Sequence, residues 1–566
     1  MKFYYGVNPA EKREKLLFSK AVKPIIDNII SLADEAVCRE QPALRMSEYM
    51  LFFQNGNRDI FEGKYFSRRR DCNHLMFAYW LTQDEKYLTP LTDYIMYICD
   101  EFSWCVPAHS NYSERSASEV IESIDLFQAE TARLFAEIKM CVGDSLPPYV
   151  LDRMEYEVRR RVFSTILDAT HGKYWWESCD TNWTAVCSAG CIMAGLYFGT
   201  EEEQKLFVER FKVCLDNYLS GIPDDGCCLE GMWYWGYGFE NFAILAKAIE
   251  VYTGGETNYL KDPKLKKLAL FPQKIRMSET KVALFADSDE AFPFKYGLAS
   301  LLKSINPEFA RPEICPDRRL CITYGNVDSV CELLWLDENY QSDSFSLETT
   351  YFPDAQWYIV CRDKYSFAGK GGHNSELHNH NDVGSFMITV GEEPFISDLG
   401  RGEYTRENFA AETRYTLLQN NSRGHSVPVI NGEYQIPGME YRAENVRVEG
   451  NTFELDIEGA YKKGIIAGIN RKFSFEDGKI VLTDTFVKNE NTSEITERFI
   501  TKKEPVLFDG CVDCGVGRIF YDAKRYIPKI STELFVGFEK QKETVYFVDF
   551  VAVSKDEQVF TFEFIV

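Results

Sequence analysis

The chain has few histidines and lacks the sequence marks of several large protein classes. Among 566 residues there are seven histidines. No stretch reaches the roughly 18 uninterrupted apolar residues that a membrane span requires. Neither a Walker A loop nor a strand-linked dinucleotide fingerprint is present, so those nucleotide-binding folds are not indicated. The net charge of −24, from 63 Lys and Arg against 87 Asp and Glu, argues against nucleic-acid and membrane partners.

The N-terminus and the cysteines bear on the cellular location. The first residues contain no apolar segment followed by a small-residue cleavage site, which a secretory signal would have. The 17 cysteines are an odd number and are scattered through both halves of the chain, as is typical of a reduced compartment. We therefore expect a cytoplasmic protein, with a secreted mature form as the alternative.

An acidic chain can still bind an anionic substrate through a local basic cleft. The run Ser67-Arg68-Arg69-Arg70 is one candidate for such a cleft, and a solvated basic turn is the alternative interpretation. Aromatic residues make up 14% of the chain. Tyrosine and tryptophan stack on sugars but also fill cores, so this share favours a carbohydrate ligand only slightly.

The spacing of apolar residues divides the chain into a helical and a strand-rich half. In residues 126–141 and 201–218, apolar side chains recur at helical spacing. From about residue 325 the pattern changes to strands, for example at 452–457, and at 472–475 and 480–486 around a turn at Glu476-Asp477-Gly478. We predict an α+β protein with a helical domain over residues 1–320 and an antiparallel β domain over residues 321–566.

The histidines are concentrated in one segment. Four of the seven lie between residues 373 and 425, where an even distribution would place fewer than one. If His378 and His380 lie in a strand, their side chains point to the same face. Asp398 and His425 adjoin apolar, strand-like runs and could reach that face. Two imidazoles with nearby carboxylates serve metal binding or proton transfer, and a metal-free polar network between sheets is the alternative.

Three motifs of the strand-rich half stand out: His378-x-His380-x-Asp382-x-Gly384-Ser385-Phe386, Gly391-x-x-Pro394-x-x-x-Asp398-x-Gly400 and Arg423-Gly424-His425-Ser426-x-Pro428-x-Ile430-Asn431-Gly432. Two segments of the helical half accompany them: Trp175-Trp176-Glu177-Ser178-x-x-x-Asn182-Trp183 and Glu230-Gly231-Met232-Trp233-Tyr234-Trp235-Gly236-Tyr237-Gly238. Together they resemble the heparinase II/III-like polysaccharide lyases, a family that includes heparin, heparan sulfate, chondroitin and alginate-oligomer lyases.

The resemblance implies a fold and a set of residue roles. The fold is an N-terminal incomplete (α/α) toroid followed by an antiparallel β-sandwich. Asn182, Tyr234 and His378 match the catalytic residues. The metal ligands would be His380, Asp398 and His425, holding one divalent ion, zinc or alternatively manganese. Many members have Asn-His where this chain has Asn182-Trp183, so a scheme with a histidine at that position does not apply.

Other residues are candidates for contact with the sugar. The candidates of the helical half, catalytic ones included, also have plainer interpretations. Tyr234 and Tyr237 are three residues apart and could pack a helix face, and Asn182 could cap a helix. The basic candidates suit anionic groups of a sugar. The substrate-binding candidates are Tyr237, His373, Tyr415, His109, Arg115 and Arg414.

Taken together, the residues and the resemblance predict a lyase that cleaves uronate-containing oligo- or polysaccharides by β-elimination. Glycosaminoglycans are favoured over alginate by family analogy. The catalytic cleft is predicted to lie between the two domains, and the metal is expected to stiffen its β-domain wall. The alternatives are an alginate-oligomer lyase, a glycoside hydrolase that would use Asp180 and Glu230, and a non-catalytic carbohydrate-binding protein.

Overall fold

The computed structural model describes residues 2–110, 115–290, 294–314 and 328–566, which form two compact units. We call Met1–Ile222, Trp235–Ala269 and Pro293–Phe345 the helical unit, and Pro223–Tyr234, Leu270–Phe292 and Ser346–Val566 the strand unit. The domain boundary expected between residues 320 and 321 lies outside the described residues. Two segments of the first half of the chain, 223–234 and 270–292, thus belong to the strand unit.

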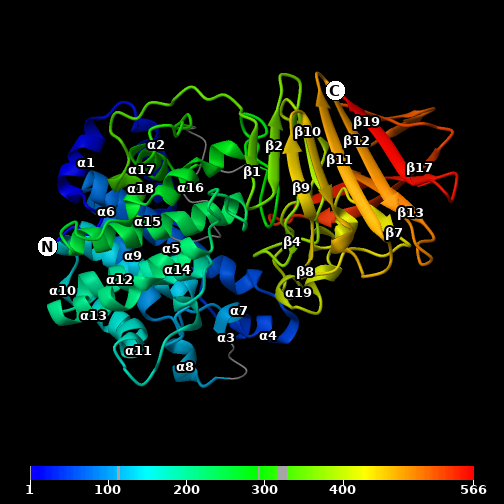
Figure 1. The fold of residues 1–566 in the computed structure, drawn as a ribbon. Coiled ribbons are helices and arrows are strands. Elements are labelled where there is room, and N and C mark those ends of the chain that lie inside the picture. The colour runs from blue at the N-terminus through cyan, green and yellow to red at the C-terminus, as the bar shows by residue number, and fades with distance from the viewer. Residues whose placement is uncertain (1, 111–114, 291–293, 315–327) are drawn as a thin grey trace. The chain divides into compact units, whose positions relative to one another are not determined.

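The helical unit is built from helices (Figure 1), several of which begin at a side-chain cap. Helix α9 begins after Asp125, whose carboxylate accepts a hydrogen bond of 2.7 Å from the backbone N–H of Gln128. Helix α13 begins at a capping box formed by Thr200 and Glu203. The helices predicted at 126–141 and 201–218 are confirmed, the second being interrupted at Lys212.

The helices have the following bounds: α1 Pro9–Phe18, α2 Lys23–Cys38, α3 Met46–Tyr49, α4 Leu51–Asn55, α5 Asp59–Thr82, α6 Glu85–Cys99, α7 Pro107–Ser110, α8 Ala117–Ile121, α9 Leu126–Val142, α10 Pro148–Val158, α11 Ser164–Ile166, α12 Asn182–Phe198, α13 Glu201–Phe211, α14 Val213–Ser220, α15 Met232–Tyr252, α16 Pro263–Lys274, α17 Tyr296–Ile305 and α18 Cys331–Leu334. Helix α15 begins in the strand unit and continues into the helical unit.

Helix α12 lies in the core of the helical unit. It packs against α9 and α13, and nearly all of its residues are buried. Gly190 permits the contact with α9, because a Cβ atom there would lie 2.3 Å from the carbonyl oxygen of Ala129. A helix that is apolar on all sides is either buried in a protein or membrane-spanning. Among the described residues, no helix is long and apolar enough to cross a membrane.

The strand unit contains antiparallel sheets. Within the described residues, one sheet has the order β1-β2-β3-β5-β6, a second β14-β15-β16-β19-β12-β11-β10-β9, a third β17-β18-β13-β7, and a small one pairs β4 with β8. The bounds are β1 Thr350–Phe352, β2 Trp357–Cys361, β3 Ser366–Lys370, β4 His373–Asn374, β5 Phe386–Val390, β6 Glu393–Ile396, α19 Arg406–Phe409, β7 Val429–Ile430, β8 Gly438–Arg442, β9 Glu444–Glu449, β10 Thr452–Asp456, β11 Gly468–Glu476, β12 Lys479–Val487, β13 Ile495–Thr501, β14 Val506–Phe508, β15 Cys511–Asp513, β16 Arg518–Phe520, β17 Tyr526–Val536, β18 Lys542–Ala552 and β19 Val559–Ile565.

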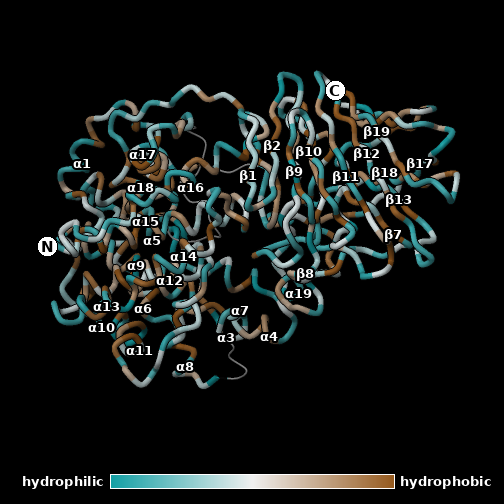
Figure 2. Tube along the Cα trace, viewed as in Figure 1, coloured by the Kyte–Doolittle hydropathy of each residue, from teal (hydrophilic) through white to brown (hydrophobic). Residues whose placement is uncertain are grey.

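Alternating side chains of these strands form the core of the strand unit. Along β11 and β12 every second residue is buried, and Figure 2 shows hydrophobic segments interspersed with hydrophilic ones there. Phenylalanines meet in this core, with ring centroids of Phe386 and Phe473 4.9 Å apart and those of Phe499 and Phe564 5.2 Å apart. The turn predicted before β12 is confirmed, with Gly478 at a φ of 70°.

A buried arginine links the core to the loops that follow His380 and His425, two of the three metal-ligand candidates. Arg471 of β11 is fully buried and forms ion pairs with Asp484 at 2.6 Å and Glu497 at 3.1 Å. It also donates to the carbonyl oxygens of Gly384 at 2.9 Å and Ser426 at 2.8 Å. Gly384 lies four residues after His380, and Ser426 directly follows His425. Arg471 therefore fixes the backbone next to both histidines.

Replacing Arg471 with methionine is expected to lower the free energy of unfolding by about 3–5 kcal/mol, because two buried carboxylates lose their cation. Denaturant-induced unfolding, followed by circular dichroism, measures this loss. The control is Lys364→Met, which removes an exposed ion pair with Asp477 and should cost less than about 1 kcal/mol. Equal effects of the two substitutions would contradict the assigned role of Arg471.

Candidate active site

His378 and His380 do not lie in a strand, because residues 375–385 form the loop between β4 and β5. The chain turns at His378, whose φ of 54° lies in the left-handed region. This conformation costs a non-glycine residue about 1–2 kcal/mol, and such strain is concentrated at functional sites. The two histidines are nevertheless brought together, through a shared carboxylate rather than a shared strand face.

Asp287 is that carboxylate. One oxygen lies 3.1 Å from Nδ1 of His378, and the other lies 3.1 Å from Nε2 of His380. A guanidinium nitrogen of Arg414 lies 3.5 Å from Asp287. Although burial opposes ionisation, Arg414 and the two histidines hold the pKa of Asp287 well below its usual range. Asp287 is therefore an ionised, fully buried acceptor that orients both imidazoles.

Tyr234 stacks directly on the ring of His378. It lies in the first turn of α15, and the two ring centroids are 3.8 Å apart at an interplanar angle of 15°. Its hydroxyl forms a hydrogen bond of 2.9 Å with that of Tyr404. The second ring nitrogen of His378, Nε2, lies 3.6 Å from a carboxylate oxygen of Glu230. A phenol, an imidazole and two carboxylates thus meet within the strand unit.

The start of α15 is fixed next to Asp287. Gly231, at a φ of 87°, turns the chain into the helix, and a Cβ atom there would lie 2.2 Å from Oγ of Ser288. The same hydroxyl accepts a hydrogen bond of 3.0 Å from the backbone N–H of Met232. This contact explains why residues 223–234 fold with the strand unit, and it holds Tyr234 beside the histidine loop.

His380, Asp398 and His425 form a second, fully buried cluster. One candidate ligand atom from each residue lies within 4.8 Å of the others. Nδ1 of His425 is 2.9 Å from Asp398, and its Nε2 is 2.8 Å from the carbonyl oxygen of Gln419. Although burial acts against it, the charges of His425 and His380 lower the pKa of Asp398 to about 2. The structure thus brings together the three residues that the sequence predicts as metal ligands.

The substrate-binding candidates of the strand unit differ in their surroundings. Tyr415 donates a hydrogen bond of 2.8 Å to the side chain of Asn379, and Arg414 donates one of 2.9 Å to the Asn379 carbonyl oxygen. Both therefore hold the loop between His378 and His380. His373 lies in β4, where Nδ1 accepts a hydrogen bond of 3.2 Å from the N–H of Ser375.

The remaining candidates belong to the helical unit. Asn182 is the first residue of α12 and is buried, but the N-cap is Thr181, so the alternative that Asn182 caps the helix is wrong. Tyr237 is buried in α15, and burial followed by the charge of Glu130 raises its pKa well above the usual range. The catalytic role of Asn182 and the substrate-binding role of Tyr237 stay predictions.

His109 and Arg115 are both held within the helical unit. Nδ1 of His109 lies 2.9 Å from Asp125, and its ring lies 5.0 Å from that of Trp183. Arg115 donates a hydrogen bond of 2.9 Å to Ser123. Trp183 therefore contacts a histidine supplied by another segment.

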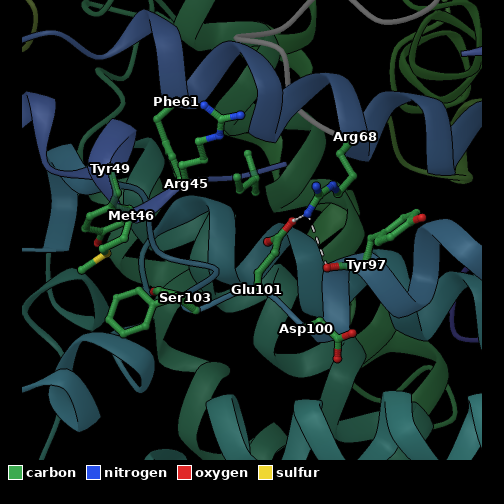
Figure 3. Close-up of a pocket in the computed structure, with 11 residues that line it drawn as sticks. Arg45, Met46, Tyr49, Phe61, Arg68, Tyr97, Asp100, Glu101 and Ser103 are labelled. Atoms are coloured by element: carbon green, nitrogen blue, oxygen red, sulfur yellow. Dashed lines mark hydrogen bonds and ion pairs between the residues drawn. The ribbon is translucent and has the colours of Figure 1, made fainter. Parts of the chain in front are cut away.

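The candidate basic cleft at residues 67–70 is not a turn but part of α5. Arg68 and Arg69 are buried and pair with Glu101 at 3.0 and 2.7 Å. Figure 3 shows Arg68 beside Glu101 and Tyr97 in a pocket of ≈380 Å³. Arg68 and Arg69 are therefore buried partners of Glu101 in the helical unit rather than the exposed side chains of a solvated basic turn.

Two residues of the site were missed by sequence reasoning. Asp287 follows the apolar run Leu284-Phe285-Ala286, and this position at the end of such a run is a weak signal that was available. Tyr404 lies in an irregular segment after β6. Its hydrogen bond to Tyr234 spans 170 residues of sequence, and no local motif marks it.

Comparison with known proteins shows which solved structures share this architecture. No protein-family model and no curated sequence matches the chain. A heparinase III structure matches over 95% of this chain and 83% of its own, at 13% identity and a TM-score of 0.59. Heparan sulfate lyase HepC from Pedobacter heparinus matches over 98% and 87%, at 13% identity and 0.58. A variant of the Streptomyces coelicolor A3 chondroitin AC lyase matches over 99% and 82%, at 10% identity and 0.55.

The chain therefore has the fold of these polysaccharide lyases. The predicted class, an incomplete (α/α) toroid followed by an antiparallel β-sandwich, is confirmed. At 10–13% identity the likeness concerns the fold, and function has to be argued from the residues of the site.

Proposed function

We propose that this protein is a polysaccharide lyase that cleaves uronate-containing glycans by β-elimination. The observation that carries the proposal is the stack of Tyr234 on His378, with His378 held by the ionised Asp287. The arrangement places a phenol and an imidazole, an acid and a base, side by side on fixed supports. General acid–base catalysis requires this kind of positioning.

The chemistry of elimination explains why two such groups are needed. The proton on C5 of a uronate is removed, the C4–O4 bond breaks, and a C4=C5 double bond forms. A base must accept the C5 proton, and an acid must protonate the leaving O4 oxygen. Negative charge accumulates on the uronate carboxylate, so a hydrogen-bond donor must stabilise it. Asn182 is our proposal for that donor, because its amide donates without adding a full charge.

In this scheme His378 is the base and Tyr234 is the acid. Asp287 accepts the Nδ1 proton of His378 and thereby leaves Nε2 as the basic nitrogen. Once Nε2 has accepted the C5 proton, the imidazolium is stabilised by Asp287 and by Glu230, 3.6 Å away. For a sugar of the opposite C5 configuration, Tyr234 would serve first as base and then as acid.

The proposed substrates are glycosaminoglycan fragments, with alginate fragments as the alternative. The fold similarity to heparinase III and to a heparan sulfate lyase supports the first class. The choice of substrate class thus rests on an analogy between folds.

The buried cluster fits a divalent metal ion, which we propose is zinc, with manganese as the alternative. Nε2 of His380 is engaged by Asp287, whereas its Nδ1 is buried without a hydrogen-bond partner in the described part of the chain. Metal-binding histidines use one nitrogen for the metal and the other for an outer carboxylate or carbonyl, and His425 has such a carbonyl in Gln419. His380, Asp398 and His425 would hold the ion, which would supply fixed positive charge.

Replacing His380 with alanine is expected to weaken metal binding by more than about 100-fold, because one of three protein ligands is lost. Elemental analysis after dialysis against zinc measures the bound metal. His171→Ala, an exposed histidine of the helical unit, is the control and should leave the metal content unchanged. Unchanged folding, metal content and rate in His380→Ala would rule out the proposed metal site.

Incubation with uronate oligosaccharides tests the proposed function. The new double bond is conjugated with the carboxylate, so ultraviolet absorbance should rise with heparan sulfate, chondroitin sulfate, hyaluronan or alginate fragments. Cleavage without absorbance would favour the glycoside hydrolase alternative. Binding without cleavage would favour a carbohydrate-binding protein.

A further inference from the structure

Tyr404 is a residue of the site that neither the sequence motifs nor the elimination scheme uses. Its hydroxyl forms a hydrogen bond of 2.9 Å with that of Tyr234. Tyr234 is 6% exposed, whereas Tyr404 is half-buried. The two phenols therefore form a short chain that begins at the ring stacked on His378 and ends at a side chain with access to water.

The surrounding structure fixes the ring of Tyr404. Its segment is anchored by a β-bridge between Gly402 and Gly537 and by a hydrogen bond of 3.2 Å from the N–H of Glu403 to the Val536 carbonyl oxygen. The ring packs edge-on against Phe409 and Phe538, with centroids 5.0 and 5.1 Å away. A ring held on two sides keeps its hydroxyl directed at Tyr234.

Although burial acts in the opposite direction, the charge of Asp287, 3.5 Å away, followed by the phenols of Tyr415, Tyr404 and Tyr234, raises the pKa of Arg414. By reciprocity, the guanidinium favours negative charge on Tyr404 or Tyr234. The cluster can therefore accommodate a transient phenolate that is passed between the two oxygens.

We propose that Tyr404 is a relay residue that reprotonates Tyr234 after each turnover. This inference rests on the proposed function. In the elimination step the O–H proton of Tyr234 passes to the leaving O4 oxygen, and Tyr234 becomes a phenolate. The O–H bond of Tyr404 then breaks, its proton passes to Tyr234, and Tyr404 takes a proton from water. The C5 proton leaves His378 for solvent, so both groups return to their starting states.

A Tyr404→Phe variant separates the first turnover from later ones. Phenylalanine keeps the packing against Phe409 and Phe538 and removes only the relay hydroxyl. The substrate is the heparan sulfate, chondroitin sulfate, hyaluronan or alginate fragment that the unmodified protein cleaves fastest. With excess enzyme, the first turnover should keep its rate within about twofold, whereas steady-state kcat should fall about tenfold or more. KM should fall with kcat, because kcat/KM reports the first turnover and stays unchanged.

The control is Tyr521→Phe, which removes a phenol that donates to the Phe508 carbonyl oxygen in the same unit and should change neither rate. An equal slowing of the first and later turnovers in Tyr404→Phe would show that Tyr404 only positions Tyr234 and would overturn the relay. Unchanged rates in Tyr404→Phe would overturn it as well. Absence of any unsaturated product from the unmodified protein would instead contradict the proposed function.

Discussion

Replacing Tyr234 with phenylalanine is expected to lower kcat by about 10²–10⁴-fold, the range for loss of a general acid. Phenylalanine keeps the ring that stacks on His378 at 3.8 Å but cannot protonate the leaving oxygen. KM should change little, because the lost interaction forms mainly in the transition state. The rate is followed by the absorbance of the unsaturated product, with circular dichroism as the check on folding.

Tyr521→Phe is the matched control for Tyr234→Phe, because it removes one phenol hydroxyl elsewhere in the strand unit. It should retain full activity. If Tyr234→Phe retained more than about a tenth of the activity, a general-acid role would be untenable. His378→Ala should also be strongly impaired on the C5 configuration for which His378 is the base.

An Asp287→Asn variant is expected to lose about 10³–10⁴-fold in kcat, by analogy with the loss of the orienting carboxylate in a Ser-His-Asp triad. The amide can accept from one histidine but presents a donor to the other. His378 would then be held in the wrong tautomer, or His380 would lose the outer partner that orients it. Zinc affinity should also fall by about 10–100-fold.

The neighbouring Asp289 provides the control for this substitution. It is partly exposed and pairs with Arg401 rather than with the histidines. Asp289→Asn should therefore keep both its rate and its metal content. A normal rate with lost metal in Asp287→Asn would confine Asp287 to the metal cluster and would contradict its role in orienting His378.

The sequence predicts the residues that could carry out the chemistry better than it predicts the residues that orient them. The association of His378, His380, Asp398 and His425 was predicted from the family resemblance together with their spacing, because these residues follow one another along closely spaced elements of one half of the chain. The loop at His378 was not predictable from alternation, since a left-handed turn in a non-glycine residue has no periodic signature. Asp287 lies 91 residues before His378, so its contact depends on tertiary packing.

The order of a helical half followed by a strand-rich half was also predictable. Which unit each segment packs with was predictable only in part. Helical spacing predicted the helices over residues 126–141 and 201–218. It does not indicate that the first turn of α15 packs with strands. That placement depends on tertiary contacts such as that of Gly231 with Ser288 and that of Asp225 with Asp354, which leave no periodic trace in the sequence.

Product analysis in heavy-oxygen water tests the central claim most directly. Elimination consumes no water, so mass spectrometry of a digested uronate oligosaccharide should show one fragment with an unsaturated uronate end and no incorporated label. The Tyr234→Phe variant should form this unsaturated fragment far more slowly than the unmodified protein does. Incorporation of one labelled oxygen into a saturated reducing end would show hydrolysis and would contradict the account.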